Sequence, residues 1–283
     1  MSSTFNEFYH KKTGLTVGVE KVLFSEQSTY QKVKVLKTDT WGNLMTIDGM
    51  VMLSEKDEFV YHEMLSHVPL FSHPDPRRIL IIGGGDGGTA REVMLHPSVQ
   101  KVDLVEIDET VVRASKQFLP KVGDWNNHKL NVIIGDGITY VQEITESYDV
   151  ILIDGSDPTG PAAGLFEKDF LQACYDGLAE DGILAAQTES PWVEHYHPSM
   201  KDVFTALDEL YEVSKMYLAY IPLYPAGMWS FGFASKGPDP LSDFTKQHVE
   251  KRLPKLGRKL KYYNAAVHSG SFGLPNFVKG IIK

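Results

Sequence analysis

The stretch RILIIGGGDGGTAREVMLHPSVQKVDLVEID (residues 78–108) contains an apolar run, a glycine-rich loop, a helix-like segment and a second apolar run that ends in acids. This order predicts a βαβ unit with a nucleotide site at the loop. Gly83, Gly85 and Gly88 fit the pattern G-x-G-x-x-G. Glu106 follows about 20 residues later, where an acid can accept a hydrogen bond from a ribose hydroxyl.

The glycine loop also carries a carboxylate, Asp86, at a place where dinucleotide enzymes bring the backbone against a pyrophosphate. A carboxylate there would repel phosphate and attract a nucleoside that bears a sulfonium or an amine. Together with Glu106 and Asp108, it favours S-adenosylmethionine or a relative over NAD. The alternative is that Asp86 only caps the turn between strand and helix.

From residue 74 onward, apolar runs alternate with amphipathic stretches such as Glu109–Leu119. This alternation predicts a doubly wound α/β domain over residues 74–283, with a Rossmann-like parallel sheet. The strand-like runs are Ile79–Ile82, Val102–Ile107, Val132–Ile134, Val150–Ile153 and Ile183–Gln187. The carboxyl ends of parallel strands open onto the ligand crevice, so the polar residues there are site candidates.

The preceding segment, residues 1–73, predicts a small β domain that ends in a helix. Alternating polarity in KVKVLKT and the turn pairs around Gly42 and Gly49 indicate short antiparallel strands. The run Ser54–Asp57 is a candidate capping box for a helix that Pro69 is expected to end.

Composition restricts the function classes. The 283 residues carry a formal net charge of −9 and show no basic face, which argues against nucleic acid as a partner. No apolar run approaches the roughly 20 residues that span a bilayer, and the first residues lack the apolar core of a signal peptide. We therefore expect a cytoplasmic enzyme without a membrane partner. Cys174, the only cysteine, is expected to pack rather than react.

The second informative segment is DVILIDGSDPTGPAAG, from Asp149 to Gly164. It predicts a buried strand that runs into a Pro/Gly-rich substrate loop. Asp154 and Asp157 can both face the crevice there, where two carboxylates would hold an ammonium or share a proton. The alternative is that they only shape the turn before Pro158. Asp136-Gly137 leaves the same choice between a helix cap and a contact to an adenine amino group.

Several histidines and aromatic residues fit more than one interpretation. A lone His62 beside Tyr61 is more often a packing residue than a ligand. His195 and His197 lack a third metal ligand in the sequence, so we expect no metal site. Aromatic side chains near the C-terminus could form a wall of an amine channel or pack in the core; they are Tyr220, Tyr224 and Trp229.

Several segments in the same order resemble the polyamine aminopropyltransferases and, among them, the spermidine synthases. They are TYQKVKV (Thr29–Val35), EKDEFVYHEML (Glu55–Leu65), GGGDGG (Gly83–Gly88), VEID (Val105–Asp108), GDG (Gly135–Gly137), DGSDPTGPA (Asp154–Ala162) and YYNAAVHSGSFGLPNFVK (Tyr262–Lys279). The resemblance covers nearly the whole chain. It implies a small N-terminal β domain before a Rossmann-like domain of the S-adenosylmethionine methyltransferase kind.

The resemblance also implies an activity, which is transfer of an aminopropyl group from decarboxylated S-adenosylmethionine to putrescine. The products would be spermidine and 5′-methylthioadenosine, and no prosthetic group would be needed. Asp86 would meet the ammonium of the donor, and Asp154 would be the general base, helped by Tyr61 and Asp157. The rest of the donor would contact Gln31, Glu106, Asp136, Gly137 and Pro161. The acceptor amine would contact His62, Asp154, Gly155, Ser156, Asp157, Gln187 and Tyr220.

His62 departs from the family pattern, since many members have Gln there. Two rival functions remain at this point. An amine N-methyltransferase would use intact S-adenosylmethionine in the same fold, although Asp86 would repel the carboxylate of that donor. A catalytically silent polyamine-binding protein would have the same fold but would not need a general base at Asp154. The small N-terminal domain exposes strand edges that usually need cover, so a homodimer or homotetramer is expected.

Overall fold

The computed structural model describes residues 3–10, 13–156 and 160–282. Its first six strands pair antiparallel, as a β1–β2 ribbon and a sheet in the order β3-β4-β5-β6. Asp48 and Gly49 both have positive φ in the two-residue turn between β5 and β6, which matches the twist of a hairpin. The strands are β1 (Ser3–His10), β2 (Thr13–Val19), β3 (Lys21–Gln27), β4 (Lys32–Lys37), β5 (Asn43–Ile47) and β6 (Met50–Ser54).

The large sheet has seven strands in the order β12-β13-β11-β10-β7-β8-β9, which confirms the predicted doubly wound fold. Strands β7 to β11 run parallel, and β12 and β13 join antiparallel at one edge. The chain order reverses between β7 and β10, where such sheets open a crevice for a ligand. The strands are β7 (Arg78–Gly83), β8 (Lys101–Glu106), β9 (Leu130–Ile134), β10 (Tyr148–Asp154), β11 (Leu178–Gln187), β12 (Val213–Tyr220) and β13 (Met228–Ser235).

Helices cover both faces of this sheet. One apolar cluster joins it to α1, α2 and the segment around α7, and a second joins its other face to α4, α5 and α6. The α-helices are α1 (Glu58–Ser72), α2 (Gly88–Met94), α3 (Glu109–Phe118), α4 (Gly137–Gln142), α5 (Lys168–Gly177), α6 (His197–Leu210), α7 (Asp243–Arg252), α8 (Ala265–Gly270) and α9 (Asn276–Lys279). Short 3-10 helices are η1 (Gly160–Phe166), η2 (Glu194–Tyr196) and η3 (Leu253–Leu256).

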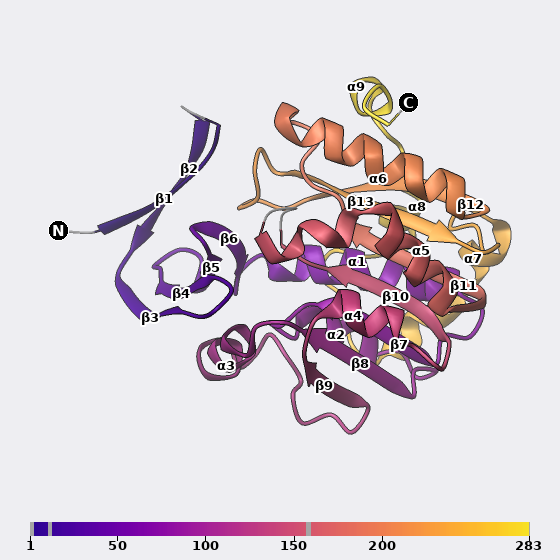
Figure 1. The fold of residues 1–283 in the computed structure, drawn as a ribbon, viewed down its shortest axis with the longest axis horizontal. Coiled ribbons are helices and arrows are strands. Elements are labelled where there is room, and N and C mark those ends of the chain that lie inside the picture. Colours follow the sequence, from indigo (N-terminus) through magenta and orange to yellow (C-terminus); the bar gives the residue numbers. More distant parts are fainter. Residues whose placement is uncertain (1–2, 11–12, 157–159, 283) are drawn as a thin grey trace.

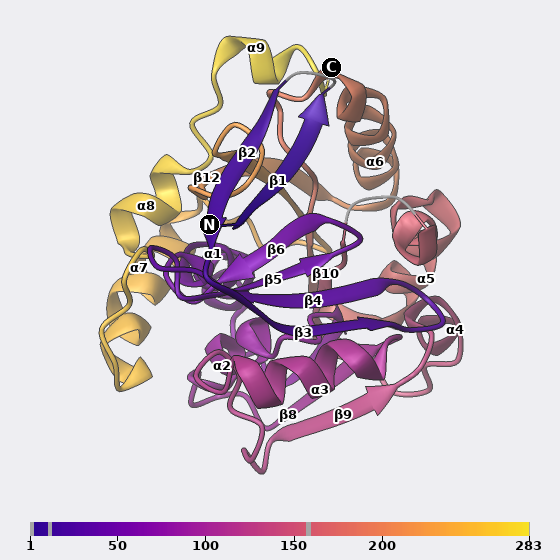
Figure 2. The ribbon, with the colours of Figure 1, turned by 90° about the vertical axis from the view of Figure 1, so that its left-hand side faces the viewer.

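The N-terminal strands lie at one end of the molecule, and the β1–β2 ribbon projects farthest from the large sheet (Figure 1). Seen from that end, the β3–β6 sheet lies between the ribbon and α3 (Figure 2). Val33 and Val35 of β4 share an apolar cluster with Val111 and Ala114 of α3. This packing places the small sheet over the crevice of the large one.

Helix α1 differs from its prediction at both ends. Ser54 donates to the Asp57 carboxylate at 2.6 Å, and no side chain caps the helix, because Asp57 also accepts the backbone N–H of Leu223. Pro69 does not end the helix, which continues to Ser72. A proline costs the helix one hydrogen bond, but the next turn buries Phe71 completely in the core of the large sheet. Within the described ranges, no helix is long and apolar enough to cross a membrane.

Candidate active site

A cavity of about 1160 Å³, including its open mouth, lies between the carboxyl ends of β7, β8, β10 and β11 and the N-terminal sheet. The fold thus brings most of the predicted site residues to one place. Those that line the cavity are Gln31, Tyr61, His62, Asp86, Glu106, Asp136, Gly137, Asp154, Gly155, Ser156 and Gln187. Asp157 lies outside the described residues, as does the side chain of Pro161.

Asp154 ends β10 and is held through both carboxylate oxygens. The Tyr61 hydroxyl donates to Oδ1 at 2.7 Å, and the Thr89 hydroxyl donates to Oδ2 at 2.6 Å. Burial, reinforced by the charge of Asp86, raises the pKa of Asp154 to about 6. A carboxylate with this pKa is ionised at neutral pH and still basic enough to accept a proton.

Glycine at the end of β7 allows this arrangement. Gly83 has φ of +81°, and a Cβ there would lie 2.2 Å from the backbone oxygen of Asp154. The Gly84 N–H donates to that oxygen at 2.9 Å. The glycine loop can therefore lie directly against the end of β10, which brings Asp86 and Asp154 into one cavity.

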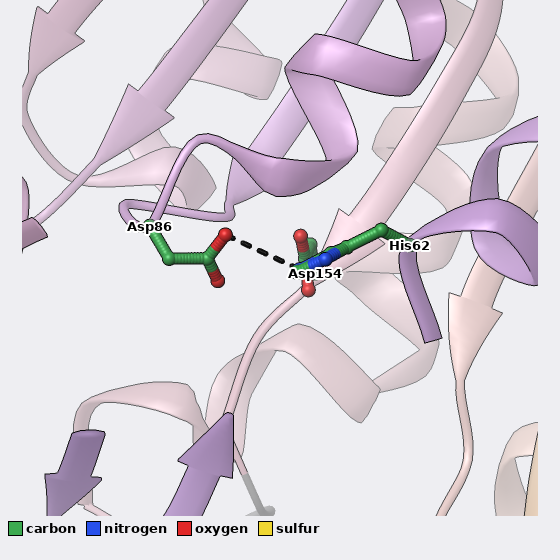
Figure 3. Close-up of side chains that lie close together, drawn as sticks. All are labelled: His62, Asp86 and Asp154. Atoms are coloured by element: carbon green, nitrogen blue, oxygen red, sulfur yellow. Dashed lines mark ion pairs between the residues drawn. The ribbon is translucent and has the colours of Figure 1, made fainter. Parts of the chain in front are cut away.

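Asp86 pairs with His62 (Figure 3). Nε2 of His62 lies 3.2 Å from Oδ1 of Asp86, and Nδ1 lies 2.5 Å from Oε2 of Glu58. Burial alone would lower the pKa of this imidazole, but the two carboxylates outweigh it and raise the pKa to about 10. The same pairing lowers the pKa of Asp86, against the opposing effect of burial.

One atom each from His62, Asp86 and Asp154 lies within 4.8 Å of the others, the spacing of a metal site. Their hydrogen bonds favour a different interpretation. The imidazole bridges two carboxylates, and Asp154 accepts from two hydroxyl groups. We therefore describe the trio as an ion cluster of carboxylates around an imidazolium. Elsewhere, Nε2 of His197 lies 2.9 Å from the backbone oxygen of Pro191.

Glu106 ends β8 and faces the part of the cavity where the sequence predicts a ribose. Its carboxylate accepts the backbone N–H of Gly85 at 3.1 Å and that of Asp108 at 2.9 Å. Burial outweighs these bonds and raises its pKa to about 7. A carboxylate held so close to the glycine loop is placed to accept hydrogen bonds from a diol.

Asp136 and Gly137 begin α4 on the same side of the cavity. Asp136 accepts the Ile138 N–H at 2.9 Å, so the predicted helix cap is present. It also lines the cavity, and its second oxygen accepts the Thr139 hydroxyl at 3.2 Å. A Cβ on Gly137 would come within 2.5 Å of the Ile82 side chain. Glycine therefore lets α4 approach β7 closely enough to complete the pocket.

The N-terminal sheet contributes Gln31, which is buried at the roof of the cavity. Ser28 links this segment to the large domain. Its hydroxyl accepts the Gln31 N–H at 3.1 Å and donates to Asp108 at 2.7 Å. Asp108 in turn caps α3. These bonds join the N-terminal sheet to the large domain at the end of β8.

Two residues predicted for the amine channel differ in their relation to the cavity. The Gln187 amide lines the cavity but donates to the backbone oxygens of Gly155 and Ser156, so it supports the loop after Asp154. Tyr220 is 63% exposed and is not among the described residues that line the cavity. Tyr224 lines it instead, with its hydroxyl on the backbone oxygen of Met52.

Three further residues at the cavity or in contact with its side chains were not predicted from the sequence. Thr89, the second donor to Asp154, lies in the first turn after the glycine loop. That position in the sequence could have indicated a site residue. Arg91 binds Glu58 at 2.8 Å and so supports the pair with His62. Glu7 lines the cavity from the β1–β2 ribbon, and no pattern in the sequence connects that ribbon to the site.

The chain matches two described domains in adjacent segments. Residues 4–55 match the spermidine synthase tetramerisation domain, and residues 58–246 match the spermine/spermidine synthase domain. The boundary between the two matches falls before α1, the helix that packs in the core of the large sheet.

Curated relatives and solved structures agree with these matches. The chain is 44% identical to polyamine aminopropyltransferase 1 of Bacillus cereus, over 100% of both chains. It is 42% identical to the Clostridium botulinum polyamine aminopropyltransferase, over 98% of this chain and 97% of the relative.

Two spermidine synthase crystal structures have the same fold. One, in complex with the transition state analogue AdoDATO, superposes with a TM-score of 0.94 at 41% identity and covers 99% of this chain and 94% of its own. The other, from Thermotoga maritima, has a TM-score of 0.91 at 40% identity, with the same two coverages. The family resemblance in the motifs is confirmed, and the chain belongs to the polyamine aminopropyltransferases of the spermidine synthase family.

Proposed function

We propose that this enzyme is a spermidine synthase that transfers the aminopropyl group of decarboxylated S-adenosylmethionine to putrescine. The observation that carries the proposal is the pair of carboxylates in one cavity, Asp86 for a cationic donor and Asp154 for a reacting amine. The AdoDATO complex of the similar spermidine synthase supports the choice of donor. The reaction needs no prosthetic group.

The proposed step is a displacement at carbon. A primary amine like that of lysine has a pKa near 10.4, so freeing its lone pair at pH 7 costs roughly 4 to 5 kcal/mol. The amine nitrogen bonds to the propyl carbon next to sulfur while the carbon–sulfur bond breaks. The bonding pair goes to sulfur, which becomes a neutral thioether, and one proton of the amine goes to Asp154. Tyr61 and Thr89 keep the carboxylate oriented toward the nitrogen.

The remaining roles are carried over from the family resemblance to the matching residues of this chain. Asp86 binds the donor ammonium, and Glu106 accepts hydrogen bonds from the ribose. Gln31, Asp136, Gly137 and Pro161 contact the rest of the nucleoside. Asp157 binds the ammonium at the non-reacting end of the acceptor. The rest of the acceptor contacts Tyr61, His62, Asp154, Gly155, Ser156 and Gln187. Tyr220 is exposed in the described structure, so we assign the aromatic wall to Tyr224.

Product analysis tests the activity. The enzyme is incubated with decarboxylated S-adenosylmethionine and an equimolar panel of putrescine, cadaverine, agmatine and spermidine, with intact S-adenosylmethionine in parallel. We expect spermidine and methylthioadenosine as the main products. A methylated amine would identify the N-methyltransferase, whose donor carboxylate Asp86 should repel. Binding of amine without any product would identify a silent binder.

The pH dependence of the reaction provides a second expectation. Glu106, with pKa about 7, must be ionised to accept from the ribose, and Asp154, with pKa about 6, must be ionised to accept the proton. Both pKa values are raised, so kcat/KM should fall as the pH is lowered through this range. Initial rates between about pH 5 and about pH 9 measure the effect. A constant kcat/KM across that range would show that neither carboxylate acts as proposed.

We also propose that the N-terminal strands assemble copies of the chain into a homodimer or homotetramer, and that the enzyme works in the cytoplasm. The match of residues 4–55 to a tetramerisation domain supports the assembly. So does the exposure of Phe8 on β1 and Val22 on β3, since apolar side chains on projecting strands favour a partner. Light scattering of the purified chain measures the mass directly, and a monomer would contradict the assembly.

A further inference from the structure

His62 has a carboxylate oxygen at each of its ring nitrogens. Nδ1 lies 2.5 Å from Glu58, and Nε2 lies 3.2 Å from Asp86. A neutral imidazole has one N–H, so its other nitrogen would direct a lone pair at a carboxylate oxygen. The geometry therefore requires the imidazolium, with both nitrogens donating. The free enzyme thus holds a cation at the carboxylate that is proposed to bind the donor ammonium.

The ring cannot move aside easily. His62 is 1% exposed, and a Cβ on Gly88 would lie 2.3 Å from its ring, so the ring lies directly on the backbone of α2. Tyr61 contacts it edge to face at 5.5 Å between centroids. Its partner Glu58 is fixed by two bonds to Arg91, at 2.8 Å and 3.1 Å. Any change at this site must therefore come from proton movement rather than from rotation of the side chain.

The charged groups around the ring come from each element packed against it. Helix α1 contributes Glu58, the glycine loop Asp86, strand β10 Asp154 and helix α2 the Arg91 guanidinium. A donor ammonium at Asp86 would stand next to the imidazolium in a mostly buried site, where like charges repel strongly. A neutral imidazole would instead offer its Nε2 lone pair to an N–H of the ammonium, while Nδ1–H continues to donate to Glu58.

We propose that His62 is the protein's own cation at the subsite for the donor ammonium, and that the donor binds at Asp86 in exchange for the Nε2 proton of His62. This exchange rests on the proposed function, since it requires a donor with an ammonium. The released proton goes to solvent, one substrate ammonium takes its place, and the charge of the cluster is unchanged. His62 is then a positioning residue that keeps Asp86 oriented in the free enzyme and accepts from the ammonium in the complex.

Isothermal titration calorimetry of the full chain tests the exchange. The donor is titrated into the enzyme near pH 8.5 in several buffers that differ in ionisation enthalpy. The observed binding enthalpy is plotted against the buffer ionisation enthalpy, and the slope gives the number of protons released. At this pH Glu106 and Asp154 are already ionised in the free enzyme, whereas His62 still carries its proton. We expect release of about one proton per chain. Methylthioadenosine, which fills the nucleoside site without an ammonium, should release close to none.

The His62→Gln variant is the matched control, because an amide can donate to one carboxylate but has no proton to lose. It should bind donor with almost no proton release. If this variant does not fold, the native enzyme still gives a second test. Its donor affinity should rise about tenfold per pH unit between about pH 8 and about pH 9.5, below the pKa of about 10 of His62, while that for methylthioadenosine stays constant. Donor binding without proton release would overturn the exchange and leave the proposed function standing. A complete lack of donor binding would overturn both.

Discussion

An Asp154→Asn variant is expected to transfer aminopropyl groups about 10² to 10⁴ times more slowly than the native enzyme, since a positioned general base contributes a factor of this size. Asparagine can still accept from Tyr61 or Thr89, so the cavity should keep its shape. It cannot take the proton of the attacking amine. The loss should therefore appear in kcat, measured by methylthioadenosine release at saturating donor and acceptor, and donor affinity should change little.

Asp149→Asn provides a control on the same strand. Asp149 lies near the opposite end of β10, where it accepts the backbone N–H groups of Arg77 and Arg78, and it is not among the described residues that line the cavity. Its substitution should lower stability slightly and leave kcat near the native value. If Asp154→Asn kept more than about a tenth of the native kcat, the proton acceptor would have to be another group.

Asp86→Asn should weaken binding of decarboxylated S-adenosylmethionine by about 2 to 4 kcal/mol, that is roughly 30-fold to 1,000-fold. The reason is that a mostly buried ammonium would lose its counter-charge. The amide oxygen can still accept the Gly88 N–H, as the Asp86 carboxylate does at 2.6 Å, so the loop should be preserved. Affinity for methylthioadenosine should be almost unchanged, because that nucleoside has no ammonium. Calorimetric titration of both ligands measures the difference.

Asp136→Asn is the comparison for this prediction. Asp136 lines the same cavity but caps α4 on the nucleoside side. Its substitution should weaken donor and methylthioadenosine by similar factors. Asp86→Asn should also reduce the preference for decarboxylated over intact S-adenosylmethionine, because the repulsion of the donor carboxylate is removed. If Asp86→Asn lost equal affinity for the donor and for methylthioadenosine, Asp86 would shape the loop and would not bind the ammonium.

The sequence predicted the large sheet and the acidic ends of its strands correctly. Apolar runs and the glycines that separate strands from helices are local properties of the chain. Parallel strands necessarily bring their carboxyl ends to the same edge of the sheet. Asp86, Glu106 and Asp154 therefore met in one cavity as expected. The helix after the N-terminal strands was predicted, but not its end, since the burial of Phe71 outweighs the local cost of Pro69.

The partners of these carboxylates depended on packing between segments far apart in the sequence. Tyr61 reaches Asp154 across 93 positions, because α1 packs on the large sheet. Tyr220 and Tyr224 were both candidates for the aromatic wall, and only Tyr220 was assigned to the acceptor amine. The turn after β12 instead places Tyr224 at the cavity and leaves Tyr220 exposed.

The sequence by itself thus determined the fold, the family and the acidic character of the site, because each depends on periodicity or on short motifs. The tertiary structure alone decided which hydroxyls hold Asp154, that Gln187 supports a loop, and that His62 pairs with Asp86. Hydrogen bonds and ion pairs require their atoms to meet within about 3 Å, and that distance is set by the packing of the whole chain.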